Sequence, residues 1–238
     1  MTQQTSAPAT TSADGRGHCG PAARVTKSLL GYGMIAGPLY LATSVIEGLT
    51  RPGFDFTRHD WSLLSNGPGG WIHIATFIVV GLMTIACAVG VRRSLHPGPG
   101  ARWAPRLIGG YGAGLIGGGI FRADPAAGFP SGTPADAHAV SWHGMLHLVS
   151  GALGFLCLIA ACLVIARRFA ADRRRGWALY SRATGVLFLV GFGCIASGAN
   201  APWAVLAFTA AVVIAWTWLT ALSLQLYRRT DAAVATDR

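Results

Sequence analysis

Six long apolar runs, separated by short polar segments, constrain the fold of this chain more than any other feature of its sequence. A helix needs about 20 residues to cross the hydrocarbon core of a bilayer, and most of these runs are of that order. Each run is continuous, whereas the strands of a membrane barrel alternate apolar and polar residues, so we exclude a barrel. The sequence therefore predicts an all-α, polytopic membrane bundle with six transmembrane helices. They cover residues 28–49, 71–91, 107–121, 142–166, 183–197 and 203–227.

The charged residues are few, and they gather at the ends of the apolar runs. They make up 12% of the chain, against about 25% in a typical soluble domain. All basic residues except Arg51, Arg58 and Arg122 fall in the terminal segments and in the loops at 92–106 and 167–182. The positive-inside rule then places both termini in the cytoplasm. The net charge of +10 is explained by this topology, and we expect no nucleic-acid partner.

The chain divides into one transmembrane domain and two polar tails. Residues 1–26 contain no apolar core, which predicts a disordered cytoplasmic tail and not a signal peptide. The transmembrane domain covers residues 27–229, and a short cytoplasmic tail covers residues 230–238. Arginine almost entirely replaces lysine, as in a GC-rich bacterial genome, so we expect a bacterial inner-membrane protein surrounded by lipids. The cysteines lack metal-ligand spacing, and packing is their expected role.

Residues capable of chemistry gather at the predicted outer surface. The richest stretch is 138–147, which enters the fourth apolar run and contains His138, His143 and His147. His143 and His147 are four positions apart, so on a helix they share one face. The neighbouring outer loops add three further candidates, which are Asp60, Ser62 and Asp124.

Four short motifs occupy these outer segments. They are residues 51–55 (RPGFD), 59–67 (HDWSLLSNG), 119–125 (GIFRADP) and the stretch 138–147. Their order and spacing resemble those of a family of bacterial membrane proteins known as domain of unknown function 998. The resemblance covers about residues 28–227 and implies an integral membrane protein. It implies no settled biochemistry, so function has to be argued from the residues themselves.

One hypothesis for the outer residues is a metal-dependent hydrolase that acts on a lipid or another amphiphile. Two histidines at this spacing can bind one zinc ion, with His138, Asp60 or Asp124 as a third ligand. Zinc with an open position lowers the pKa of a bound water to about 7 and makes it a nucleophile. Ser62 or a carboxylate would then stabilise charge or relay protons. This set of side chains is similar to that of ceramidase-like membrane hydrolases, although the motifs do not match residue by residue.

A second hypothesis gives the same residues a purely structural role. Asp60 or Asp124 would pair with a neighbouring arginine, and the histidines would hydrogen-bond to loop carbonyls. The outer tryptophans would form an interfacial belt, as amphipathic rings commonly do at the headgroup level. They are Trp61, Trp71 and Trp142.

The glycine-rich runs support further expectations. Helices interrupted by Gly and Pro are typical of transporters, which makes a small-solute transporter the third hypothesis, although the runs lack an acidic residue at mid-depth. Gly110, Gly114 and Gly118 recur at intervals of four, which predicts the close approach of another helix, from this chain or from a second copy in a homo-oligomer. Haem ligation between His73 and His147 is the remaining option for the histidines.

Overall fold

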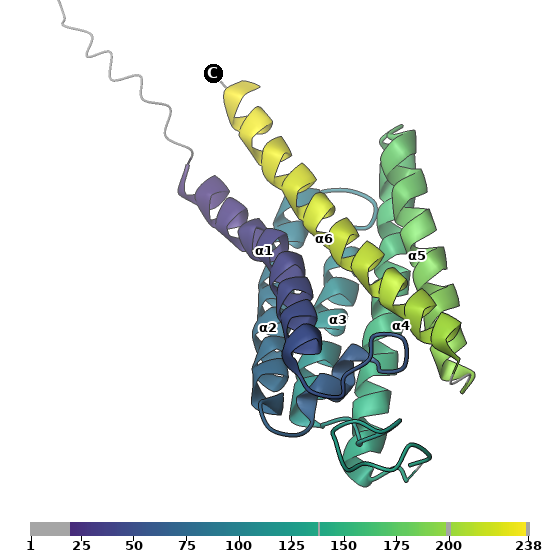
Figure 1. Cartoon of the computed structure of the whole chain (residues 1–238). Coiled ribbons are helices and arrows are strands. Elements are labelled where there is room, and N and C mark those ends of the chain that lie inside the picture. Colours follow the sequence, from purple (N-terminus) through teal and green to yellow (C-terminus); the bar gives the residue numbers. More distant parts are fainter. Residues whose placement is uncertain (1–19, 138, 199–200, 237–238) are drawn as a thin grey trace, which may run out of the picture.

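The computed structural model describes residues 20–137, 139–198 and 201–236, and helices form the regular structure of these ranges (Figure 1). This confirms the predicted all-α class. One short 3-10 helix, η1 (Trp61–Ser65), follows the first long helix. The long helices are α1 (Pro21–Thr50), α2 (Gly70–Leu95), α3 (Trp103–Ile120), α4 (Trp142–Ala171), α5 (Arg175–Ala196) and α6 (Pro202–Thr236).

The first and last helices extend beyond the predicted spans. α1 begins at Pro21, a residue suited to the first turn because its missing N–H has no helical partner there. Residues 21–26 and 230–236, which we expected in the two tails, are therefore helical. Hydropathy marks where contact with lipid ends, whereas a helix continues until a stop signal, and no Gly or Pro follows Arg229. The remainder of the expected amino-terminal tail, residues 1–19, lies outside the described residues.

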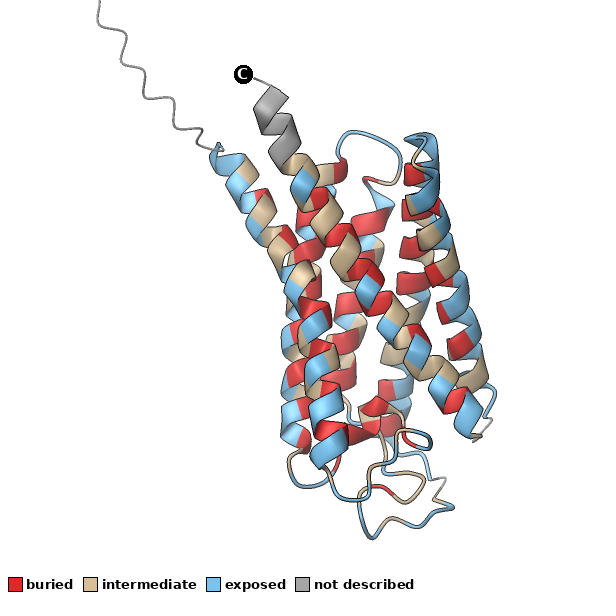
Figure 2. Cartoon of the chain, turned by 45° about the horizontal axis from the view of Figure 1, so that its top comes forward, coloured by how far each residue is buried: buried red, intermediate tan, exposed pale blue. Residues whose placement is uncertain are grey.

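The helices have the composition of a multi-pass membrane protein. Five of them, α1, α2, α4, α5 and α6, are long and apolar enough to cross a bilayer. α3 is only 18 residues long, and glycine takes the place of larger apolar side chains along it. Many large apolar side chains are exposed, such as Leu179, which is 68% exposed. Figure 2 shows buried residues on the inward sides of the helices and exposed residues on their outward sides. This pattern suits a lipid surrounding, in which exposed leucine has no cost.

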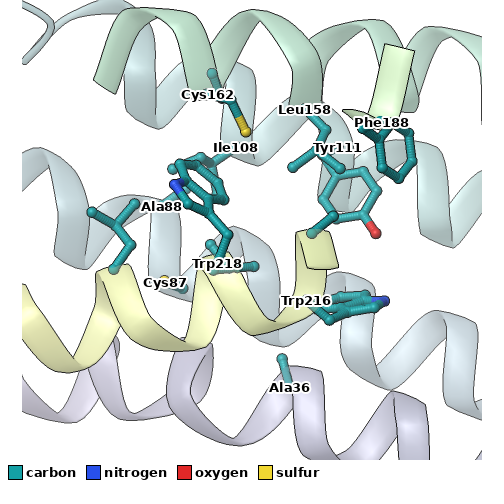
Figure 3. Close-up of a cluster of buried hydrophobic side chains, with 14 of the residues drawn as sticks. Ala36, Cys87, Ala88, Ile108, Tyr111, Leu158, Cys162, Phe188, Trp216 and Trp218 are labelled. Atoms are coloured by element: carbon teal, nitrogen blue, oxygen red, sulfur yellow. The ribbon is translucent and has the colours of Figure 1, made fainter. Parts of the chain in front are cut away.

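The six helices close into a ring, because each packs against the next along the chain and α6 returns to α1 (Figure 1). Large side chains fill the interior. Trp216 and Trp218 of α6, Tyr111 of α3 and Phe188 of α5 are buried there, and the rings of Trp216 and Tyr111 pack on each other (Figure 3). The Trp218 indole N–H donates to Ser181 Oγ at 3.0 Å, which satisfies its one buried donor. Cys87 and Cys162 are also buried in this core, as packing residues.

Glycines bring α3 into backbone contact with both of its neighbours. A Cβ atom at Gly114 would lie 2.7 Å from the Cα of Gly154 in α4. Toward α2, Gly112 and Gly81 face each other, and a Cβ on either would lie 2.7 Å from the carbonyl oxygen of the other. The row at 110, 114 and 118 faces α4 throughout, as its spacing of four predicts. This glycine face is therefore occupied within one chain, and the homo-oligomer stays a prediction.

The connecting segments fall at two opposite ends of the ring (Figure 1). One end, which we call the basic end, has the start of α1, the end of α6 and the loops at 96–102 and 172–174. The other end, which we call the capped end, has the long segments 51–69 and 121–141. These two segments pack on each other. Arg51, for example, has its guanidinium 5.5 Å from the centre of the Phe129 ring.

Candidate functional site

A cavity of about 840 Å³ lies at the capped end and continues between the helices. Its walls come from the loops at 58–63, 123–127, 135–137 and 139–140 and from residues of all six long helices. Polar or charged side chains line its loop end. These are Arg58, Asp60, Ser62, Asp124 and His147. Apolar side chains line the part that lies between α4, α5 and α6, and they include Phe155, Phe192, Ile195, Val205, Phe208 and Val212.

Asp60 is placed in the cavity wall by the turn that begins η1. Its backbone carbonyl accepts from Leu63 N at 3.0 Å, but its carboxylate makes no capping bond to this helix. Oδ1 is buried and has no hydrogen-bond partner in the part of the chain that the structure describes. Burial raises the pKa of this carboxyl to about 6, because ionisation in a poorly solvated wall is unfavourable. Ser62, from the first turn of η1, lines the same wall.

Asp124 has a structural task at the start of α4. Its carboxylate accepts from Ser141 N at 2.7 Å and from Ser141 Oγ at 2.6 Å. Ser141 Oγ in turn accepts from Gly144 N at 3.0 Å, which makes Ser141 the N-cap of α4. A negative charge at a helix N-terminus is also favoured by the helix dipole. The structural hypothesis expected Asp124 to pair with an arginine, but the carboxylate instead holds this helix end.

The two histidines of α4 have different surroundings. His147 is buried, and its Nδ1 lies 2.8 Å from Phe121 O and 3.1 Å from Gly118 O. Both partners are acceptors, so Nδ1 carries the hydrogen and Nε2 is the nitrogen left for a ligand. His143 is exposed and packs on Trp142, with ring centres 3.7 Å apart. Only His147 of this pair lines the cavity.

The structure therefore brings together Asp60, Ser62, Asp124 and His147, and leaves His143 outside the cavity. His138 lies outside the described residues. Within the described ranges, no group of three His, Cys, Asp or Glu side chains has an arrangement that suits a metal ion. The zinc ligation by His138, His143 and His147 stays a prediction that depends on His138.

Sequence analysis missed a second buried polar cluster beside the cavity. Glu47 of α1 is 5% exposed, and its Oε2 lies 2.8 Å from Nδ1 of the fully buried His73 of α2. Arg51, one turn beyond Glu47, has its Nη1 3.8 Å from Glu47 Oε1. The sequence contains one indication of this cluster, because Glu47 is the one acidic residue inside the six apolar runs. Nothing in the sequence shows that its partner is His73.

Aromatic rings separate this cluster from the cavity. Tyr40 of α1 lies 6.0 Å from the His73 ring and 5.9 Å from the Trp61 ring, measured between ring centres. Trp61 is 7% exposed, so it belongs to the core and not to the interfacial belt that we expected. Trp71 and Trp142 are exposed, as belt residues should be. Phe77 packs against both His73 and His147, the two residues considered as haem ligands.

The model of a protein family of unknown function, DUF998, matches residues 34–225, which is most of the chain. The chain belongs to the DUF998 family. This match confirms the resemblance inferred from the four motifs. No curated protein and no solved structure matches the chain. The function of this DUF998 protein therefore has to be inferred from the geometry of the site.

The four motifs of the resemblance hold one another in place at the capped end. Arg51 of the first donates to the carbonyl of Leu64, at 3.2 Å, and to that of Asn66, both in the second. Asp124 of the third binds Ser141 of the fourth. His147 of the fourth binds Phe121 O of the third. The motifs at 59–67, 119–125 and 138–147 contribute residues to the polar wall of the cavity, and the motif at 51–55 supports the second motif from outside it.

Proposed function

We propose that this DUF998 protein binds an amphiphilic molecule in the cavity at the capped end, which faces the outside of a bacterial inner membrane. In this proposal all six helices span the bilayer and both termini are cytoplasmic. The capped end then lies at the depth of the outer lipid headgroups. A ligand that enters there has its polar group among the loops and its apolar chain among the helices.

The topology is supported by the distribution of charge between the two ends. The basic end has nearly all of the arginines, and the capped end has only Arg51, Arg58 and Arg122. Loops rich in Lys and Arg stay in the cytoplasm in proteins of this kind. A reporter fused after Arg238 tests this directly. It should be active only in a cytoplasmic format, and periplasmic activity would overturn the topology.

The single observation that carries the binding proposal is the change of polarity along one continuous cavity. Its volume is in the range of sites for small ligands, which measure about 300–1,000 Å³. Asp60, Asp124 and His147 lie at its loop end, and the rings of Phe155 and Phe208 lie between the helices. A wholly polar solute would leave this apolar part unfilled, and a hydrocarbon would bury Asp60 without compensation.

Equilibrium binding to the protein purified in a neutral steroid-glycoside detergent tests the proposal. The probes are radiolabelled dodecyl amphiphiles with cationic, anionic and neutral headgroups. At least one should bind saturably with one molecule per chain. Val212→Trp, which fills the cavity, should abolish this binding, whereas Val213→Trp on the exposed side of the same helix should retain it. Non-saturable partition of every probe, or equal binding by both variants, would refute it.

A metal-dependent hydrolase of lipids is the second candidate, and the tautomer of His147 favours it. Its Nδ1–H is fixed by two carbonyls, which leaves Nε2 as a ligand in a cavity shared with Asp60 and Asp124. Elemental analysis of protein that has met no chelator decides the question. Near-stoichiometric zinc that is lost in both His143→Ala and His147→Ala would support the hydrolase. A metal-free wild type would contradict the hydrolase. The remaining functions would then be amphiphile binding and transport, and transport would be detected as uptake into proteoliposomes.

A further inference from the structure

The geometry points to a positively charged ammonium headgroup as the chemistry that this cavity selects. This inference rests on the proposed binding of an amphiphile and names its class. The ammonium group would lie against the Asp60 carboxylate and against the aromatic rings that line the same space.

Asp60 is the charged group of the cavity that has no other task. Asp124 is bound to Ser141, and Arg58 is an exposed side chain whose Nη2 lies 3.4 Å from Ala127 O. A buried carboxylate without a partner is unfavourable, because the wall replaces little of the solvation that water supplied. A cationic ligand removes this penalty, whereas an anionic one adds repulsion. The arginines that would attract an anion lie mostly at the basic end.

Aromatic rings line the same cavity. Tyr40, Trp61, Phe77, Tyr111 and Trp216 all line it, and they come from α1, η1, α2, α3 and α6. Measured between ring centres, Trp216 lies 5.3 Å from Tyr40 and 5.5 Å from Tyr111. Figure 3 shows Trp216 and Tyr111 side by side. The negative face of an aromatic ring attracts cations, and aromatic walls of this kind recognise quaternary ammonium groups.

Asp60 and these rings act on the same volume. Trp61, the first residue of η1, follows Asp60 directly, and Asp60, Trp61 and Tyr40 line the same cavity. A hard metal cation requires about six oxygen ligands, and this wall offers one unpartnered carboxylate oxygen and several aromatic side chains. The combination therefore suits an organic cation with an apolar chain.

Three probes with one dodecyl chain test the headgroup. They are dodecyltrimethylammonium, dodecyl sulfate and dodecyl glucoside, measured at pH 8 in the neutral steroid-glycoside detergent. The wild type should bind the ammonium probe at least ~10-fold more tightly than the sulfate, because the carboxylate and the aromatic rings both attract a cation. Asp60→Asn should remove most of this preference and leave the affinity for the glucoside unchanged.

Asp55→Asn is the matched control, because Asp55 is an exposed carboxylate in the same loop that accepts from Thr57. It should leave all three affinities unchanged. Equal affinities for the three probes in the wild type, or equal losses in the two variants, would overturn the headgroup assignment and leave amphiphile binding intact. If no probe binds saturably, the proposed function itself fails.

Discussion

Glu47, which is buried, and Asp60, which is partly buried, are two carboxylates at the same end of the molecule, and their surroundings differ. Glu47 is held by His73 and Arg51, and none of these three residues lines the cavity. Asp60 lines the cavity, and its Oδ1 has no partner among the described residues. A paired buried charge fixes two helices, whereas an unpaired one is kept at a cost to stability and is available to a ligand. The comparison thus distinguishes the carboxylate that is paired within the protein from the one that we propose binds the ligand.

Removing Glu47 should have the largest effect on stability. Glu47→Ala leaves His73 buried without its partner, which typically costs about 3–5 kcal/mol. Denaturant unfolding of the purified protein in detergent measures it. The double variant Glu47→Leu/His73→Leu should lose much less, because it leaves no orphaned polar group. If the single variant is as stable as the double one, the pair does not have the structural role assigned here.

Removing the charge of Asp60 should stabilise the protein. Its folded pKa of about 6 lies above the usual value near 4, so folding binds a proton between these values and wild-type stability falls as the pH rises through them. Asp60→Asn stays neutral and should unfold at a temperature a few degrees higher at pH 8, equivalent to about 1–3 kcal/mol. The advantage should shrink at pH 5. Thermal unfolding at the two pH values measures this, and a less stable variant at pH 8 would show that Asp60 has a structural partner.

Arg51 lies between Glu47 and the turn that begins at Asp60, and its substitution should have a moderate effect on stability. It approaches Glu47 and donates to the carbonyls of Leu64 and Asn66 at the end of the turn that begins at Asp60. Arg51→Lys keeps the charge but loses the planar fork, which should cost about 1–2 kcal/mol. Both the free energy of unfolding and the affinity for the ammonium probe should decrease. Loss of stability with unchanged binding would show that η1 holds Asp60 without Arg51.

The smallest expected effect is the pH dependence of ligand binding. Ionised Asp60 attracts an ammonium group, so affinity should rise up to about ten-fold from pH 5 to pH 7 and then level off. Titration of the ammonium probe measures it. Tyr40, Arg58, Asp124 and His147 line the same cavity, so the control is Asp60→Asn, which should give a flat profile. A step that persists in the variant would assign the pH dependence to another of these groups.

The sequence was sufficient to predict the helices and the end at which the polar residues gather. Both follow from the lengths of the apolar runs and from the alternation of loops between two ends. It was not sufficient to predict contacts that depend on how each helix is rotated about its axis. The rotation of α1 against α2 pairs Glu47 with His73, and that of α4 buries His147 while it exposes His143. The capping role of Asp124 depends on the path of the loop before Ser141, which no spacing in the sequence specifies.

The glycine contacts of α3 have a consequence for how the protein is made. Under the proposed topology α3 enters the bilayer with little hydrophobic driving force of its own, because glycine gains far less from lipid than leucine does. It packs closely against α2 on one side, at Gly81, and against α4 on the other, at Gly154. During synthesis α3 emerges before α4, so at first it can pack only against the helices that precede it. The short helix that lines the cavity therefore has both of its packing partners only after α4 has emerged.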